Sequence, residues 1–392
     1  MLLAHKIELK PNNKQATYFA RACGTARFAY NWALSEWKRQ YEAGEKPTEV
    51  SLRKQLNAIK KTEFPWMQEV TKVAPQQAIK NLGQAFTRFF AKQGSHPQFK
   101  KKGIRDSFRA DNGPAKAGDS AAKIEDQKIK LPLVGWVRLK EVLRFEGQIK
   151  SIIVSRKASR WYAAISVETA QLPHQRKAVN TVGVDLGIKT LATLSTGEQY
   201  TGPKAHTVLL KRLQRTSRQL SRKEKGSHNR CKARTKLATL HARISNIRKD
   251  YLHKFTTELV LSNTCIGIED LHVKGMAANR RLSRHIMDQS FYECRRQLAY
   301  KSDWYRSELV VIDRFYPSSK RCHCCGYLND ALTLSDRHWR CDCGVEHDRD
   351  INAAMNIKQL ALASTVSSTG IDACGAKGAG LGTLYQGETM LH

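Results

Sequence analysis

The chain has 392 residues, and its 67 lysines and arginines outnumber its 35 aspartates and glutamates, giving a formal net charge of +32. Such an excess attracts polyanions and displaces the counterions condensed on nucleic acid, so we expect a nucleic-acid partner. A basic ribosomal-type or nucleoid protein is the simpler alternative. No apolar stretch reaches the ~18–20 residues of a membrane span, and the N-terminal sequence has no signal-peptide core. We therefore expect a cytoplasmic, nucleoid-associated protein with no membrane partner.

The N-terminal part of the chain is predicted to change from helices to strands. Residues 1–10 read as a strand, and a helical region follows at 14–93. Its clearest helix begins at Pro75 and has an apolar face typical of helix packing. The members of that face are Ala78, Leu82, Phe86 and Phe89. From about residue 107 the period becomes two, and short β-branched runs predict a small antiparallel barrel.

A basic stretch at 99–109 joins the predicted helices to the predicted strands. Its candidate phosphate-binding residues are Lys100, Lys101, Lys102 and Arg109. Two interpretations stay open, a solvated linker or contact with nucleic-acid phosphates.

The next region opens with two strands at 181–186 and 190–196, and Gly187 between them favours an antiparallel hairpin. A basic stretch at 204–254 then has the apolar spacing of two helices broken near Gly226. A charge run is usually a solvated face, but this one lacks the alternating glutamates that would offset it. We therefore predict contact with a phosphate backbone. The arginines selected for that role are Arg212, Arg215, Arg218, Arg222 and Arg234.

Three acidic residues stand at the end of an apolar run or at the start of a helix: Asp185, Glu269 and Asp350. Asp185 shares a strand face with the small Gly183, which we interpret as leaving room for a metal and a phosphate. Asp350 could instead be a plain helix N-cap, a role for which Asp348 competes. Carboxylates brought together from separate elements suit Mg²⁺, which prefers oxygen ligands, and metal-assisted cleavage of a phosphodiester.

A cysteine cluster precedes Asp350 directly. Cys322 and Cys325 form a CxxC pair, Cys341 and Cys343 form a CxC pair, and a glycine follows each pair. Two such pairs are typical of a tetrahedral Zn²⁺ ribbon in a segment too small to bury a core. The CxC pair is tighter than usual and leaves the ligand set open. The possible substitutes are Cys324, His323, His338 and His347.

Several segments resemble the TnpB (OrfB) proteins of bacterial insertion sequences. They are RFAYNWAL at 27–34, PQFKKKGIRDSFR at 97–109, GVDLGIKTLAT at 183–193, IGIEDL at 266–271, the cysteine cluster and HDRDINAAMNI at 347–357. These proteins are RNA-guided DNA endonucleases related to type V CRISPR effectors. The resemblance implies a RuvC-like site in which Asp185, Glu269 and Asp350 hold two Mg²⁺ ions, besides one structural Zn²⁺ and no small-molecule cofactor. It also implies a guide RNA from the element end and a double-stranded DNA target next to a short flanking motif.

The resemblance implies a multidomain α+β fold. Its parts are a wedge β-barrel at 1–13 and 104–178, a helical recognition lobe at 14–103, a RuvC/RNase H-like nuclease at 179–313 and 347–360 and a zinc ribbon at 314–346. The composition of residues 361–392, rich in Gly, Ser, Ala and Thr and without periodicity, predicts a disordered tail. Two other functions stay open: an RNA-guided DNA-binding repressor that has lost catalysis, and a transposase that joins DNA strands. The presence of all three acids favours the nuclease.

Overall fold

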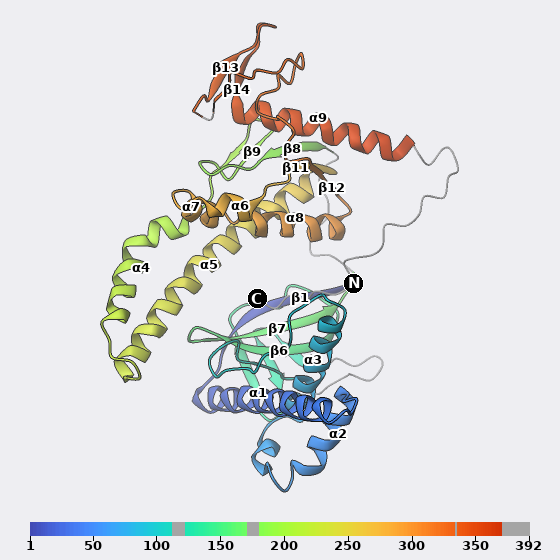
Figure 1. The fold of residues 1–392 in the computed structure, drawn as a ribbon, viewed down its shortest axis with the longest axis vertical. Coiled ribbons are helices and arrows are strands. Elements are labelled where there is room, and N and C mark those ends of the chain that lie inside the picture. Colours follow the sequence, from blue (N-terminus) through green and yellow to red (C-terminus); the bar gives the residue numbers. More distant parts are fainter. Residues whose placement is uncertain (112–121, 171–179, 334, 371–392) are drawn as a thin grey trace. The chain divides into compact units, whose positions relative to one another are not determined.

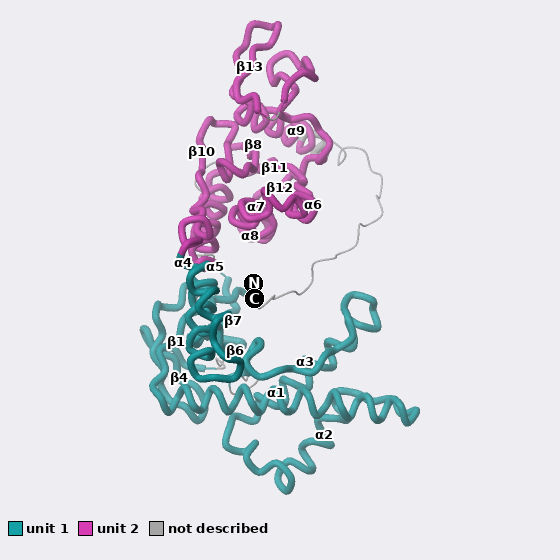
Figure 2. Tube along the Cα trace, turned by 60° about the vertical axis from the view of Figure 1, so that its left-hand side comes forward, with its two compact units in different colours: residues 1–174, 212–243 teal, residues 175–211, 244–392 magenta. Residues whose placement is uncertain are grey.

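The computed structural model describes residues 1–111, 122–170, 180–333 and 335–370. The chain divides into two compact units, shown in different colours in Figure 2. Unit 1 comprises residues 1–174 and 212–243, and unit 2 comprises residues 175–211 and 244–392. Within the described ranges, no helix is both long enough and apolar enough to cross a membrane.

The strands of unit 1 form one seven-stranded antiparallel sheet in the order β2-β6-β7-β1-β5-β4-β3. The strands are β1 (Leu2–Lys10), β2 (Ser107–Arg109), β3 (Lys123–Glu125), β4 (Lys128–Leu131), β5 (Gly135–Leu139), β6 (Gln148–Lys157) and β7 (Arg160–Glu168). The predicted antiparallel strands are therefore confirmed. Because β2 and β3 are the end strands, hydrogen bonding among the described strands does not close the predicted barrel into a ring.

The predicted helical region is also confirmed in unit 1. It contains α1 (Asn13–Glu42), α2 (Glu49–Ile59), the 3-10 helix η1 (Pro65–Glu69) and α3 (Val73–Phe90). Helix α1 begins with a capping box, because the Asn12 side chain accepts from the backbone of Gln15 and the Gln15 side chain accepts from the backbone of Asn12. The apolar face predicted for α3 is buried at Ala78, Leu82 and Phe86.

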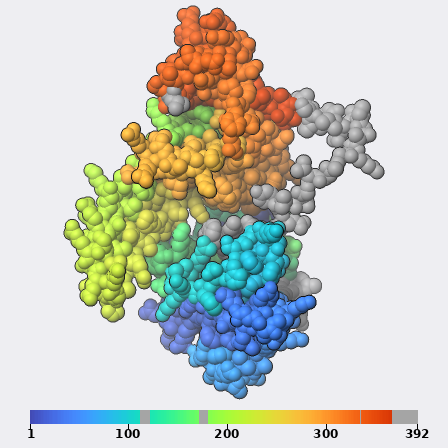
Figure 3. Space-filling model, in the orientation of Figure 1, coloured from blue at the N-terminus to red at the C-terminus, as the bar shows by residue number. Residues whose placement is uncertain are grey.

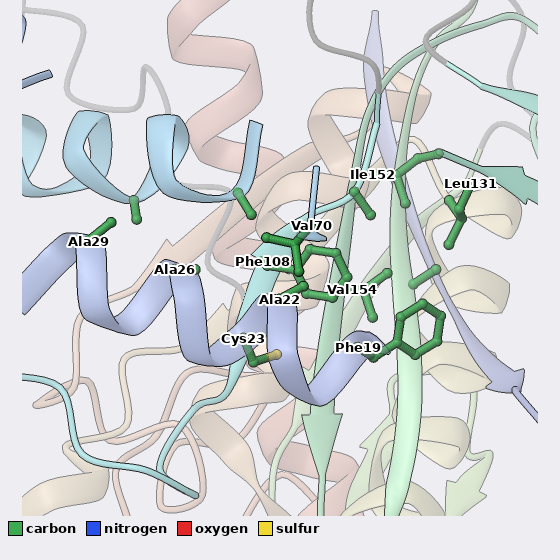
Figure 4. Packing of buried hydrophobic residues seen from close by; sticks show 14 of the residues in the cluster. Phe19, Ala22, Cys23, Ala26, Ala29, Val70, Phe108, Leu131, Ile152 and Val154 are labelled. Carbon is green, nitrogen blue, oxygen red and sulfur yellow. The ribbon is translucent and has the colours of Figure 1, made fainter. Parts of the chain in front are cut away.

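One face of α1 forms the core of unit 1 together with the sheet. Figure 4 shows Phe19, Ala22 and Ala26 on this face, beside Ile152 and Val154 of β6. Phe19 is fully buried, and the small alanines let the helix backbone come close to its neighbours. Phe19 and these alanines of α1 are thus core residues.

The sheet of unit 2 has five strands in the order β10-β9-β8-β11-β12 (Figure 1). They are β8 (Thr181–Asp185), β9 (Ala192–Leu194), β10 (Gln199–Tyr200), β11 (Cys265–Glu269) and β12 (Glu308–Ile312). Strands β8, β11 and β12 are parallel, whereas β9 pairs antiparallel with β8, as the predicted hairpin requires. The parallel strands bring the ends of β8 and β11 to the same edge of the sheet.

Helix α9 (Arg349–Gly370) packs directly on β8 and β11 (Figure 1). A Cβ atom added to Gly183 would lie 2.0 Å from the carbonyl oxygen of Ala354, and one added to Gly267 would lie 2.9 Å from a methyl carbon of Ile357. Both glycines therefore let the helix approach the sheet. The prediction that Gly183 leaves room for a metal and a phosphate is wrong, because the α9 backbone fills that space.

Unit 2 contains further elements, and residues 212–243 of two of its helices are assigned to unit 1. The further elements are α4 (Ala205–Ser221), α5 (His228–Ser262), α6 (Val273–Ala278), α7 (Ser283–Gln289), α8 (Phe291–Tyr305) and the paired strands β13 (His338–Arg340) and β14 (Glu346–Asp348). The predicted break near Gly226 separates α4 from α5. Helix α9 continues to Gly370, past the predicted start of a tail at Ala361, and residues 371–392 lie outside the described part.

Candidate functional site

The sheet brings two of the three predicted acids together. Val184 of β8 pairs with Ile268 of β11 in parallel register, so Asp185 and Glu269, the residues that follow, end adjacent strands. The third acid, Asp350, lies in the first turn of α9, which packs on the same two strands. Three acids from distant parts of the sequence thus gather at one edge of the sheet in unit 2.

The carboxylate of Asp350 does not cap its own helix. Asp348 accepts hydrogen bonds from the backbone N–H groups of Asp350 and Ile351, both at 2.9 Å, and is therefore the N-cap of α9. The Asp350 carboxylate instead faces Arg337, whose Nη1 lies 3.4 Å from its oxygen, and Arg349, whose Nε lies 3.6 Å away. The interpretation of Asp350 as a plain cap is wrong, and its carboxylate is available for another role.

The three carboxylates influence one another electrostatically. Burial, followed by the negative charges of Glu269 and Asp350, raises the pKa of Asp185 from 3.8 to about 8. Burial also raises the pKa of Glu269, although a hydrogen bond from the Ser318 hydroxyl opposes the increase. An acidic cluster of this kind is unfavourable when ionised without a cation, and a divalent ion with oxygen ligands would relieve the repulsion. The residues present therefore fit Mg²⁺.

The acids lie near one another without forming a compact cage. Across the described ranges, the cluster of Cys322, Cys325, Cys341 and Cys343 is the group of ligand atoms that all lie within 4.8 Å of one another. The oxygen atoms of the three carboxylates are not all within 4.8 Å of one another. Mutual repulsion favours such a separation, and the arginines beside Asp350 offset that repulsion in part.

The four predicted zinc ligands form this compact cluster. The sulfur atoms of Cys322 and Cys343 are 3.8 Å apart, and those of Cys325 and Cys341 are 3.5 Å apart. Tetrahedral coordination with Zn–S bonds of about 2.3 Å separates sulfur atoms by about 3.8 Å. The cluster is therefore consistent with a structural zinc, and both cysteines of the CxC pair belong to it.

The candidate substitutes for these ligands have other positions. Cys324 is exposed and lies outside the cluster. His347 is buried, and its Nε2 lies 3.1 Å from the sulfur of Cys322, so it contacts a ligand. His323 directs its Nδ1 to the side-chain oxygen of Asn352 at 3.0 Å. Burial raises the pKa of Cys322, but its hydrogen bonds, led by those from backbone N–H groups of the same turn, lower it to about 6, which favours the thiolate that binds metal.

Some residues of the basic stretch at 99–109 make contacts within unit 1. Arg109 donates to the fully buried carboxylate of Asp111 at 2.8 Å and to the side-chain oxygen of Gln77 at 3.3 Å. The Lys100 ammonium lies 4.0 Å from the centre of the Tyr30 ring. These contacts support structural roles for Arg109 and Lys100, although Lys100 is exposed like the neighbouring Lys101 and Lys102.

The five arginines selected in the stretch 204–254 are all exposed; Arg222 directly follows α4, and the other four lie on α4 and α5. In the described part of the chain, no ion pair is found for any of Arg212, Arg215, Arg218, Arg222 and Arg234. Arg230, which the sequence analysis missed, closes the turn between the helices by donating to the carbonyl oxygens of Leu220 and Lys223. In the space-filling view, this helical pair appears as a yellow-green surface (Figure 3).

A second residue missed from the sequence anchors this pair in unit 2. The carboxylate of Asp288, which is 3% exposed, accepts from the backbone N–H groups of His206 and Thr207 at the start of α4. It also pairs with Arg248 of α5 at 2.9 Å. The signal was weak, because a single aspartate in a short helix resembles any solvated acid.

Family models match three parts of the chain. The OrfB_IS605 model, described as "Probable transposase", matches residues 164–280, and the Cas12f1-like TNB domain model matches residues 291–357. A "Putative RNA-guided DNA endonuclease" of Streptomyces pristinaespiralis is 39% identical over 379 residues, which cover 94% of this chain and 91% of the relative. The chain belongs to the TnpB/OrfB family of IS605 elements.

Other comparisons agree with this TnpB assignment. The "Putative RNA-guided DNA endonuclease InsQ" of Escherichia coli (strain K12) is 35% identical, and the match covers 91% of each chain. A cryo-EM structure titled as a Cas12f1–sgRNA–target DNA complex matches with a TM-score of 0.54 and 15% identity, covering 88% of this chain and 83% of that one. The mixed α+β fold thus resembles Cas12f1, and the cysteine cluster lies in the TNB region.

One family description differs from the observed local structure. The model named for a helix-turn-helix domain matches residues 1–46. Those residues form the strand β1 and one 30-residue helix, α1. Residues 1–46 of this TnpB protein therefore do not form a helix-turn-helix.

Proposed function

We propose that this TnpB protein is an RNA-guided DNA endonuclease that cuts double-stranded DNA beside a short flanking motif. The observation that carries the proposal is the convergence of Asp185, Glu269 and Asp350 at the ends of β8 and β11 and the start of α9. Two relatives that match over most of their length bear the name of this activity. The net charge of +32 agrees with nucleic-acid partners.

The proposed catalytic site is of the two-metal RuvC type. Asp185, Glu269 and Asp350 would hold two Mg²⁺ ions, which when bound would activate water and stabilise the leaving oxygen of a phosphodiester. The chain itself supplies the oxygen ligands and fixes two of them on rigid strands. Arg337 and Arg349 balance the charge of Asp350 from the side of the helix start.

The domain assignment is part of the proposal. The five-stranded sheet with α9 supports a RuvC/RNase H-like nuclease at 179–313 and 347–360, with the zinc ribbon at 314–346 inserted before α9. The seven-stranded sheet supports a wedge domain at 1–13 and 104–178. Helices α1, α2 and α3 support a recognition lobe at 14–103.

The proposed partners are a guide RNA transcribed from the element end and the target DNA. Base pairing with the guide would select the target, while the protein would read only the flanking motif. The exposed arginines of α4 and α5 fit backbone contacts, which position a nucleic acid without specifying its sequence. Arg109 is left out of this interface because its donors are used within unit 1.

The proposal is tested by purifying the protein with the RNA it retains and sequencing that RNA. A DNA carrying the matching sequence is then incubated with the complex and Mg²⁺, beside Asp185→Ala and Glu269→Ala complexes that retain the same RNA. Cleavage by the parent and not by the variants is the expected result. Absence of a discrete RNA, or equal cleavage by a variant, would overturn the assignment. Binding without cleavage would point to a repressor, and joined DNA ends to a transposase.

A further inference from the structure

The loop that follows β12 connects the acidic site to the zinc cluster. It runs from Asp313 to Cys322, the first cysteine of that cluster. Within it, Ser318 is 6% exposed, and its hydroxyl donates to Oε1 of Glu269. Sequence reasoning had assigned Ser318 no role.

Two buried asparagines of α9 hold this loop. Asn356 donates through Nδ2 to the carbonyl oxygens of Ser318 at 2.8 Å and Arg321 at 2.6 Å. Asn352, one turn earlier, donates to the same Arg321 carbonyl at 2.7 Å. Each asparagine is 1% exposed. Because an unpaired amide at such depth is costly, these bonds fix the loop firmly on the helix.

The helix that holds the loop also carries one of the acids. Asp350 lies in the first turn of α9. Asn356 lies two residues after Ala354, whose backbone packs against Gly183 of β8. The path from Asp350 to Glu269 therefore consists of helix α9, the buried hydrogen bond from Asn356 to Ser318 and the partly buried hydrogen bond from Ser318 to Glu269. It links a carboxylate on a strand with a carboxylate on a helix.

We propose that Ser318 is a positioning residue for Glu269, and that Asn356 sets the place of Ser318 relative to α9. The inference rests on the proposed function, because it concerns the same metal site. The Ser318 hydroxyl occupies one oxygen of the Glu269 carboxylate and restricts its rotation, so the other oxygen is held ready for a cation. Partners of this kind typically contribute 10- to 100-fold to metal affinity or activity.

The test uses the full-length protein freed of RNA, with Mn²⁺ as the probe. Mn²⁺ affinity is measured by titration calorimetry for the parent, Ser318→Ala and Ser318→Thr. The matched control is Ser319→Ala, the next residue, which contacts Asn352 only through its backbone carbonyl. We expect Ser318→Ala to weaken Mn²⁺ binding roughly 10-fold or more, Ser318→Thr to restore it, and Ser319→Ala to leave it unchanged.

The RNA-loaded variants supply a second readout. For Ser318→Ala, half-maximal cleavage should require more Mg²⁺, while the rate at saturating Mg²⁺ changes less. Combining Ser318→Ala with Asn356→Ala should cost no more affinity than the larger single change, because both act through one path. Zinc content and circular dichroism establish that each variant is folded.

The outcomes separate this inference from the proposed function. If Asp185→Ala abolishes Mn²⁺ binding and Ser318→Ala leaves it at the parental value, the positioning role is refuted and the metal site stands. If Asp185→Ala also leaves Mn²⁺ binding unchanged, the proposed metal site itself fails. Failure of Ser318→Thr to restore affinity, or strictly additive losses in the double variant, would also refute the positioning role.

Discussion

Replacing Asp185 with asparagine should stabilise the metal-free protein while abolishing cleavage. The pKa of this carboxyl rises from 3.8 to about 8 in the folded chain, through burial first and then the charges of Glu269 and Asp350. A carboxyl with a raised folded-state pKa favours folding at low pH, and its contribution becomes unfavourable as pH rises towards that pKa. Asparagine keeps the shape of the side chain and removes the ionisation.

The expected gain in the free energy of unfolding follows from the difference between the ordinary pKa of the carboxyl and the pH of the measurement. From 3.8 to pH 7, each pH unit corresponds to about 1.4 kcal/mol, so the cost of a fully desolvated carboxyl is about 4 kcal/mol at pH 7. Asp185 keeps partial contact with solvent, and screening reduces the expected gain of the variant to about 2 kcal/mol. That corresponds to about 4–8 °C in the melting temperature of a unit of this size.

The assay is thermal unfolding of protein stripped of divalent ions, recorded from pH 5 to pH 9 for Asp185→Asn, the parent and Asp303→Asn, an exposed acid of α8 that serves as control. The advantage of Asp185→Asn should grow as pH rises towards about 8. Added Mg²⁺ should raise the melting temperature of the parent and leave the variant unchanged. Parallel curves for the parent and Asp185→Asn across this range would refute the reasoning.

Three other predictions concern the zinc cluster and the basic residues. Cys343→Ser should reduce bound zinc from about one equivalent to less than half by elemental analysis, because one of four ligands is lost; full retention would exclude that cysteine. Changing the five exposed arginines selected in the stretch 204–254 to glutamine should flatten the salt dependence of RNA affinity, and an unchanged slope would identify a solvated face. Arg109→Gln should instead destabilise unit 1 by about 2 kcal/mol in urea unfolding, because the buried Asp111 loses its ion pair with Arg109; a changed salt slope at full stability would restore the predicted role of Arg109.

Local patterns in the sequence predicted the elements and the chemistry of the site. The two strands predicted at 181–186 and 190–196 and the break near Gly226 depend on residues close together in the chain, and the structure has the corresponding hairpin and helix pair. The spacing of the cysteines likewise predicted the cluster, because its pairs each occupy one tight turn. Asp185 and Glu269 could be selected from the sequence because each ends an apolar run, with no knowledge of the residues that lie beside them in space.

Tertiary structure decided which groups touch. The alternation of β8 predicted room for a metal beside Gly183, but the close approach of α9 shows that the missing Cβ makes room for a helix. Ser318 meets Glu269, and Arg109 meets Gln77, through contacts between segments far apart in the chain. Periodicity reports the environment along one element, whereas such pairings depend on how separate elements pack. For that reason the residues that could bind metal were predictable, and those that hold them in position were not.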